Sequence, residues 1–502
     1  MALKVLFINP PWYRLQGLMS TYPPMGSLYI AAVLERDGFD CCVWNADYSS
    51  KPLKVSEGSS ATTTAEMTRK FQEYKDLLND LNKPVWREVR TVIQEEKPDV
   101  VGLLCYTTSV QSVLNTAAIA RQVNPECAIV CGGPHATVRP EDLLSDNSAV
   151  NFVIRGEGET AMLRFMRTLR DGGDPSGVPG LVFRNGAGLV SNERAECFED
   201  TAALPVPAKH LLRHADRLPA VVFQPIFSSR GCPAKCIYCS SFHIFGRKPR
   251  AIPVETVIEE IELLKKKFHV HHFFICDDTF ASEREHTMTL LREIVRRRLN
   301  ITWGCQTRGE KLDEDLVRAM KKAGCTQVSI GVETGSPRIR KLIKKGNTNE
   351  DVERAVALLK KYRIEVAAFF MFGFPTETRE DIEQTVAFMK KLDPYVAHCN
   401  IATPDPGTEF MEMARAQNLM PATITDWSMH YHQSPDMFIT DQFTPEEKLE
   451  LITNLQKVFD AHNKRKARLD LVKRAPLYAR IILKEKLYRH PAYLIGKLRD
   501  LT

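Results

Sequence analysis

Repeated alternation between strand-like and helix-like segments is the feature that most restricts the fold of this chain. Between about residues 223 and 415, short apolar runs such as HHFFICDDTF and EVAAFFMFGF alternate with segments whose apolar residues recur every three to four positions. We count six such units. Units of this kind build a parallel sheet covered by helices, with functional side chains at the carboxyl ends of the strands. Because a closed (β/α)8 barrel needs eight units, a smaller domain is predicted.

Residues 1–200 show the same alternation with different strand ends. The predicted strands are LKVLFINPP, DCCVWNADY, DVVGLLCYTTS, AIVCGGPHAT and AVNFVIRGEGET, and a long polar helix is expected over about residues 60–97. This order predicts a doubly wound, Rossmann-like open sheet whose ligands bind beyond the carboxyl ends of the strands. Glycines at those ends allow a ligand to approach the backbone closely. No GxGxxG follows the first strand, which argues against a dinucleotide site.

The composition sets the general class of protein. The chain has 502 residues, of which 44% are hydrophobic and 26% charged, a length that suits about two to four globular domains. A membrane span is not expected, because no run of about 18 apolar residues occurs. The start MALKVLFINPPW does not resemble a signal peptide, and thirteen cysteines without a secretion signal argue against a disulfide framework. We therefore expect a cytoplasmic protein.

Three cysteines lie close together in SSRGCPAKCIYCSS, at Cys232, Cys236 and Cys239. A structural zinc site uses four ligands, typically in two CxxC-like pairs, and no second pair follows here at the spacing of a zinc finger. His243, four residues after Cys239, leaves a Cys3His zinc site as one alternative. The other is a [4Fe–4S] cluster held by three thiolates, which keeps one iron open for a substrate or cofactor.

The segment FSSRGCPAKCIYC resembles the cluster loop of radical S-adenosylmethionine (SAM) enzymes nearly residue for residue. The resemblance implies a partial (β/α)6 barrel, with Cys232, Cys236 and Cys239 as catalytic residues that hold a [4Fe–4S] cluster. It implies that an external electron donor of the flavodoxin or ferredoxin type reduces the cluster, and that SAM is cleaved to a 5′-deoxyadenosyl radical. That radical abstracts hydrogen from an unreactive C–H bond, while the protein supplies placement and a dry pocket.

The same resemblance suggests SAM contacts at the strand ends of this domain. Asp277 and Asp278 would approach the amino group of SAM, Arg308 would meet its carboxylate, and Glu333 with Ser336 would hold the ribose hydroxyls. An ordinary alternative exists for each acid, because strand-end carboxylates also cap helices or remain solvated in loops. The full set of expected SAM contacts is Tyr238, Asp277, Asp278, Arg308, Glu333, Ser336 and Gly373.

Residues 1–200 resemble the cobalamin-binding domain that precedes many radical SAM domains, in which GGPHATVRPEDLL and VIRGEGE recur in this form. Methionine synthase carries D-x-H-x-x-G after the first strand, and its His ligates cobalt, whereas this chain reads NPPWYRLQG there. We therefore expect base-off cobalamin without a protein His ligand; the alternative is a sheet that no longer binds cobalamin. Expected cobalamin contacts are Asn9, Thr107, Ser109, Gly132, Gly133, His135, Gly156, Glu157 and Gly158, with His135 bordering the cofactor tail or only its own loop.

Two reactions fit these cofactors. A methylase uses one SAM to methylate cob(I)alamin and a second to form the radical that prepares an unactivated substrate carbon for the methyl group. An enzyme like the anaerobic magnesium-protoporphyrin monomethyl ester oxidative cyclase starts an oxidation, cyclisation or rearrangement without methyl transfer. Methylation is favoured because it is common among such enzymes, which is an argument by association. A tRNA methylthiotransferase would carry a second three-cysteine set, and a non-enzymatic binding module would not keep the cluster loop.

These inferences predict an α/β chain of three parts: a cobalamin domain over residues 1–200 with a linker to about 222, a radical SAM barrel over 223–415, and a mainly helical C-terminal region over 416–502. Residues 464–502 carry twelve Lys and Arg against three Asp and Glu. Charge confined to one end argues against a nucleic-acid partner. A basic amphipathic helix is compatible with peripheral membrane contact, and equally with packing on its own domain. We expect a small-molecule or lipid-like substrate.

Overall fold

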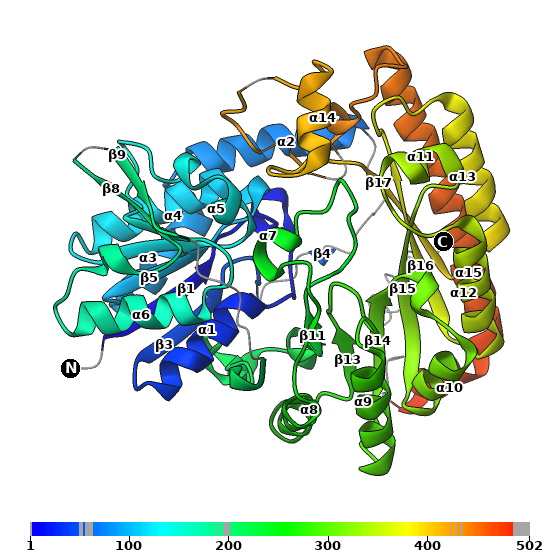
Figure 1. Ribbon diagram of the computed structural model, residues 1–502, viewed down its shortest axis with the longest axis horizontal. Coiled ribbons are helices and arrows are strands. Elements are labelled where there is room, and N and C mark those ends of the chain that lie inside the picture. Colours follow the sequence, from blue (N-terminus) through cyan, green and yellow to red (C-terminus); the bar gives the residue numbers. More distant parts are fainter. Residues whose placement is uncertain are drawn as a thin grey trace.

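The computed structural model contains two parallel sheets that lie side by side (Figure 1). The first sheet comes from the N-terminal half of the chain, and the second from strands between residues 225 and 401. This is the α/β architecture that the alternation predicts. The structure describes residues 3–49, 54–55, 64–186, 188–193, 201–421, 423–428, 430–431 and 434–484.

The first sheet has the strand order β3–β1–β5–β6–β7–β8–β9. Alternate side chains of β1 enter two different cores, one shared with α1 and α6 and the other with α3 and α4, so helices cover both faces. The doubly wound arrangement is therefore confirmed. Its five parallel strands are β1 (Lys4–Asn9), β3 (Asp40–Asn45), β5 (Val100–Leu104), β6 (Ala128–Gly132) and β7 (Phe152–Ile154), and the helices are α1 (Met25–Arg36), α4 (Val110–Val123), α5 (Pro134–Val138) and α6 (Glu159–Arg170).

Two features of this half differ from the prediction. The polar helical stretch expected over about residues 60–97 is divided into two helices, α2 (Thr64–Asn79) and α3 (Pro84–Glu96), because Pro84 lacks the N–H that would continue α2 and instead starts α3. An antiparallel hairpin of β8 (Leu181–Asn185) and β9 (Gly188–Ser191) extends the sheet. The paired residues Asn185 and Gly188 are joined by a two-residue connection that starts with Gly186, a turn signal that the strand–helix alternation does not reveal.

The second sheet has the order β10–β13–β14–β15–β16–β17, with every pair parallel. It is an open arc, because β10 and β17 are its two edges. The predicted partial (β/α)6 barrel is thus confirmed. The strands are β10 (Pro225–Ile226), β13 (His272–Ile275), β14 (Thr302–Thr307), β15 (Cys325–Glu333), β16 (Glu365–Phe372) and β17 (Val396–Ile401), and the helices are α8 (Val254–Phe268), α9 (Arg284–Arg296), α10 (Glu314–Lys322), α11 (Pro337–Leu342), α12 (Asn349–Lys361) and α13 (Arg379–Leu392).

Smaller elements join the two sheets. The segment that contains the three cysteines runs between the sheets, and it is bounded by β11 (Ser229–Arg230) and β12 (Arg250–Ala251), which pair antiparallel. The short helix α7 (Phe242–Phe245) follows the last cysteine and lies in the centre of the view in Figure 1. The remaining short pair is β2 (Leu18–Met19) with β4 (Lys54–Val55).

The C-terminal region is mainly helical, as predicted. It contains α15 (Pro445–Lys484), which packs along the edge strand β17, and α14 (Glu409–Ala416) directly precedes the region. No helix within the described residues is long and apolar enough to cross a membrane. Of the basic stretch 464–502, residues 464–484 belong to α15, with side chains described only to 470, and residues 485–502 lie outside the described residues.

Candidate active site

A cavity of about 1350 Å³ lies between the two halves, and the carboxyl ends of strands from both sheets line it. Fifteen of the predicted site residues are among its lining residues, and four are not. The lining ones are Asn9, Thr107, Ser109, Gly132, Gly133, Gly156, Glu157, Gly158, Cys232, Cys236, Tyr238, Cys239, Asp278, Arg308 and Glu333; the others are His135, Asp277, Ser336 and Gly373.

The three clustered cysteines are free thiols that face this cavity. The Cys232 Sγ lies 3.1 Å from the Thr279 hydroxyl, and the Arg308 Nη1 donates to the Cys236 Sγ at 3.5 Å. Burial raises the pKa of the Cys239 thiol to about 11, so metal binding would have to supply the driving force for its deprotonation. The Arg308 guanidinium beside the Cys236 sulfur favours the thiolate form of that cysteine.

The donor set fits a [4Fe–4S] cluster better than zinc. The imidazole of His243, the fourth zinc ligand considered above, has its Nε2 2.8 Å from the Gly407 carbonyl oxygen. Within the described ranges, no three His, Cys, Asp or Glu side chains meet closely enough to hold a single ion. A four-iron cluster is larger than one ion and needs its thiolates further apart. Three cavity-facing thiols on one loop meet that requirement.

Asp277 has its hydrogen-bond partners within the chain, and its expected contact with the amino group of SAM stays a prediction. Its carboxylate is buried, and it accepts bonds from the Ser228 N–H (2.7 Å) and hydroxyl (2.5 Å) and from the Ser229 N–H (3.0 Å) and hydroxyl (2.7 Å). With four donors supplied by the chain, Asp277 anchors the start of the cysteine segment and does not face the cavity. Burial raises its pKa, and these hydrogen bonds oppose the shift.

Asp278 shapes the same segment from the cavity side. It accepts from the Gly231 N–H at 3.2 Å and from the Ser241 hydroxyl at 2.6 Å, so it bridges the residues before and after the three cysteines. Gly231 has a φ of +88°, and a Cβ there would lie 2.6 Å from the Lys248 carbonyl oxygen. Only glycine fits this close approach without moving the backbone.

A buried charge pair that the sequence did not indicate lies next to the cysteines. The Lys345 ammonium donates to the Glu333 carboxylate at 2.7 Å and lies 3.1 Å from the Tyr238 hydroxyl, which itself donates to Glu333 at 3.0 Å. All three side chains line the cavity. Lys345 was missed because it follows α11 within a run of basic residues, KLIKKG, that resembles an ordinary solvated surface.

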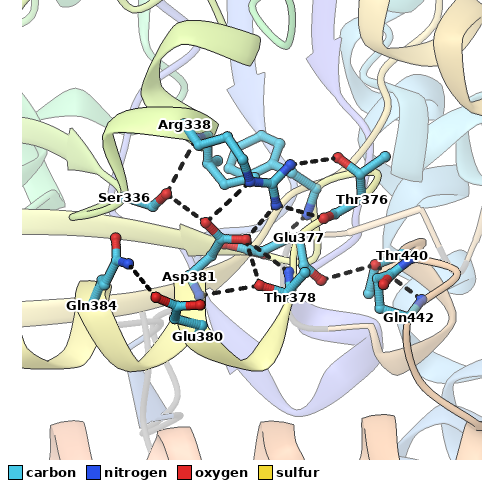
Figure 2. Close-up of polar contacts among 12 residues, drawn as sticks. Ser336, Arg338, Thr376, Glu377, Thr378, Glu380, Asp381, Gln384, Thr440 and Gln442 are labelled. Carbon is cyan, nitrogen blue, oxygen red and sulfur yellow. Dashed lines mark hydrogen bonds and ion pairs between the residues drawn. The ribbon is translucent and has the colours of Figure 1, made fainter.

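Ser336 and Gly373 are not among the residues that line the cavity, and Figure 2 shows the Ser336 hydroxyl directed at Asp381. The Ser336 hydroxyl donates to the Asp381 carboxylate at 2.6 Å and caps α11 by accepting from the Ile339 N–H. The Gly373 N–H donates to Glu377 at 2.6 Å, and Phe438 packs against Gly373. Both residues therefore stabilise the loops behind the cavity, and their expected contact with SAM stays a prediction.

Glu377 gives the fold a pH dependence that can be measured. Burial raises its pKa from 4.5 to about 8, although it accepts from the N–H groups of Gly373 and Phe374. Because the folded-state pKa lies above the unfolded one, its contribution to stability is complete below about pH 4.5 and is lost as the pH rises to about 8.

Glu377→Gln is therefore expected to remove a pH-dependent loss of stability of up to about 1.4 kcal/mol per pH unit. Thermal unfolding midpoints between pH 5 and 8 should fall more steeply for the parent protein than for the variant. Glu380→Gln, at an exposed carboxylate of the same segment (Figure 2), is the control and should follow the parent profile. Identical slopes for Glu377→Gln and the parent would contradict the assignment.

The other wall of the cavity is formed by strand ends of the first sheet. Gly133 has a φ of +106°, and a Cβ there would lie 2.9 Å from the Cys105 carbonyl oxygen, so a larger residue would disturb this wall. Asp47, which the sequence did not single out, also lines the cavity and accepts from the Trp12 N–H at 2.6 Å. Burial raises its pKa to about 7. Bare glycine backbone and few charges suit a large, planar ligand such as a corrin ring.

His135 does not face this wall. Its imidazole is fully buried, with Nε2 3.1 Å from the Asp142 carboxylate and Nδ1 3.3 Å from the Thr107 hydroxyl. The ring also lies 5.1 Å from that of Trp427. His135 therefore supports its own loop, one of the two roles expected of it, and a contact with the cofactor tail stays a prediction.

Arg230 joins the two halves beside the cavity. Its guanidinium is buried and donates to Glu157 and Glu159 of the first domain, at 2.7 Å each. Arg250 donates to the same Glu157 at 3.0 Å, and the guanidinium of Arg230 lies 4.7 Å from the ring centre of Tyr29. The carboxylate of Glu157 is thus occupied by arginines although the residue lines the cavity. The motif RGEGE fixes the position of the cysteine segment relative to the first sheet.

Comparison with known proteins agrees with both halves. The model of the B12 binding domain matches residues 18–165, and that of the Radical SAM superfamily matches residues 226–389. The chain is 29% identical to an uncharacterized methyltransferase of Pyrococcus horikoshii, over 90% of this chain and 91% of that protein. It is 27% identical to the anaerobic magnesium-protoporphyrin IX monomethyl ester cyclase of Rubrivivax gelatinosus, over 82% and 70%.

Solved structures show the same fold. The radical S-adenosylmethionine methyltransferase TsrM from Kitasatospora setae, whose structure contains cobalamin and a [4Fe–4S] cluster, superposes with a TM-score of 0.63 at 20% identity. The match covers 83% of this chain and 75% of that one. A B12 binding domain followed by a radical SAM domain, with both facing one cavity, places this chain among the cobalamin-dependent radical SAM enzymes.

Proposed function

We propose that the protein methylates an unactivated carbon of a small molecule, with a [4Fe–4S] cluster, SAM and cobalamin as cofactors. The observation that supports this most is the single cavity, in which the cysteine thiols of one domain and the glycine-rich strand ends of the other face the same space. When bound, these cofactors would supply a hydrogen-abstracting radical and a transferable methyl group to one substrate carbon. Their shared cavity suits that transfer.

We assign the cofactors to residues as follows. The cluster is held by Cys232, Cys236 and Cys239. SAM lies over Asp278, Arg308 and the group formed by Tyr238, Glu333 and Lys345. Cobalamin lies against the first sheet, and its contacts are Asn9, Thr107, Ser109, Gly132, Gly133, Gly156 and Gly158, in a domain that ends near residue 200; the barrel domain then covers about 223–415, and the C-terminal region 416–502.

Two features of the chain would prepare such a site. The Arg308 guanidinium, next to the Cys236 sulfur, stabilises the thiolate that metal binding requires. The pairing of Lys345 with Glu333 keeps the charge near the cysteines balanced, so that the wall does not carry an uncompensated buried charge.

The products formed from SAM without any substrate test this function. The protein would be reconstituted anaerobically with iron, sulfide and cobalamin, reduced, and given SAM. Release of S-adenosylhomocysteine with a change in the absorbance of bound cobalamin is the expected result. Formation of 5′-deoxyadenosine alone would favour the second candidate, an oxidative cyclase or rearrangement enzyme, which the similarity to the Rubrivivax cyclase supports.

The cysteine segment also carries a basic surface suited to an electron donor. Lys235, Arg247 and Lys248 are exposed around the three cysteines, and the segment from Ser228 to Ala251 contains no Asp or Glu. An acidic donor of the flavodoxin or ferredoxin type would be attracted to this surface. The basic C-terminus, whose side chains are described only to residue 470, is a separate hypothesis for membrane contact.

Reversing two of these charges, with Lys235→Glu and Lys248→Glu, is expected to slow donor-driven SAM cleavage about tenfold at low salt, with a smaller effect at high salt. Cleavage driven by dithionite should be unchanged, because a small reductant needs no docking surface. The control pair Lys322→Glu and Lys457→Glu reverses exposed charges elsewhere. Equal losses with both reductants would show damage to the cluster and contradict docking here.

A further inference from the structure

The C-terminal helix α15 contributes one wall of the cavity beside the edge strand β17. The Asn463 side chain accepts from the Ala397 N–H and donates to the Ala397 carbonyl oxygen, at 2.9 Å each, so it pairs with backbone groups that the missing next strand leaves open. Gln456 and Asp460 lie on the same face of α15 at helical spacing, and both line the cavity. The helix therefore holds two polar side chains in a fixed position at the open side of the barrel.

Asp460 has unused hydrogen-bonding capacity. It is half-buried, and within the described part of the chain its carboxylate accepts no hydrogen bond and forms no ion pair. Burial raises its pKa, and the charge of Lys464 opposes the shift. Burial also raises the pKa of Cys399, with a further contribution from Asp460, which places the carboxyl close to β17.

Other charged groups of the cavity wall are already committed to protein partners. Arg230 binds two glutamates, Lys345 binds Glu333, and Asp278 accepts from two donors of the cysteine segment. The cavity lining also includes the apolar side chains of Phe369, Met371 and Phe459, and Phe459 directly precedes Asp460 in α15. A carboxylate left without a donor in such surroundings is stabilised when a ligand brings an N–H or O–H group.

We propose that Asp460, assisted by Gln456, determines specificity by binding an amino or hydroxyl group of an acceptor whose body is apolar. This inference rests on the methylase function proposed above. A carboxylate at this position would repel a carboxylate or phosphate on the same part of the substrate, so acceptors with an anionic group there are disfavoured.

The acceptor class can be tested with SAM that carries a trideuterated methyl group. Extracts of cells that contain the enzyme would be separated by ion exchange into basic, neutral and acidic small molecules, and each fraction incubated with reconstituted enzyme. The label is expected in a basic or neutral acceptor that has an amine or hydroxyl. Label confined to an acidic acceptor would overturn the proposal. The absence of label in every fraction would overturn the methylase function and, with it, this inference.

Asp460→Asn then tests the residue itself. The variant should raise the KM for the labelled acceptor at least tenfold, and calorimetry should show a similar loss of acceptor affinity without SAM. SAM cleavage without acceptor should stay at the parent rate, which also reports correct folding. Glu450→Gln, at an exposed acid of the same helix, is the control and should match the parent. An unchanged KM and affinity in Asp460→Asn would contradict the proposal.

Discussion

Replacing any one of Cys232, Cys236 or Cys239 with alanine is expected to abolish SAM cleavage. A cluster held by three thiolates loses one of its ligands with each change. Iron content per chain should fall in parallel, and 5′-deoxyadenosine should drop by at least about 100-fold. Both quantities are measured on anaerobically reconstituted protein, by iron analysis and mass spectrometry.

Cys42→Ala is the matched control for this prediction. Cys42 is half-buried in β3 of the first sheet, far along the chain from the cysteine segment, and its change should leave iron content and SAM cleavage at parent values. Full 5′-deoxyadenosine formation by any of the three loop variants would show that the cluster is held elsewhere. A zinc site would instead give protein that binds zinc and never cleaves SAM.

Arg230→Met is expected to be the most destabilising single change at the interface of the two halves. It leaves the buried carboxylates of Glu157 and Glu159 without the guanidinium that they share at 2.7 Å. Breaking a buried ion pair from one side costs about 3–5 kcal/mol. For domains of this size, that corresponds to a fall in the thermal midpoint of the order of 10 °C.

The double variant Arg230→Met with Glu159→Gln distinguishes the stability lost through an unpaired carboxylate from the stability lost through missing side-chain packing. Glu157 keeps Arg250 as its partner at 3.0 Å, so the double variant leaves no carboxylate unpaired. Its thermal midpoint should recover a large part of the loss seen with Arg230→Met alone. Arg296→Met, at an exposed ion pair of α9, is the control and should leave the midpoint unchanged. A double variant no more stable than the single one would show that the charges do not matter.

Most of the fold follows from the pattern of the sequence. The five parallel strands of the first sheet and the six of the second appear as apolar runs, since strands covered on both faces must be apolar throughout. The break at Pro84 and the β8–β9 hairpin were missed, because both depend on local turn residues and not on alternation.

The candidate site was predicted less completely than the fold. Strand ends identify which residues lie near the cavity, but not which way a side chain points. Asp277 and Asp278 are neighbours in the sequence, yet the first bonds back to Ser228 and Ser229 while the second lines the cavity. Ser336 caps a helix, as serines before a Pro-initiated helix often do.

Contacts between distant segments were beyond prediction altogether. Arg230 and Glu157 belong to motifs that were each interpreted separately, one for the cluster and one for cobalamin. Only the fold shows that they bind each other. The same holds for Lys345 and for Asp460, whose significance depends on the cavity that they face.

Electron paramagnetic resonance of protein reconstituted with iron, sulfide and cobalamin measures directly whether both cofactors occupy this one cavity. We predict a cob(II)alamin signal without the nitrogen splitting of an axial histidine, broadened or split by magnetic interaction once the cluster is reduced. An unperturbed cob(II)alamin signal beside an isolated cluster signal, or protein that retains no cobalt, would contradict a shared site.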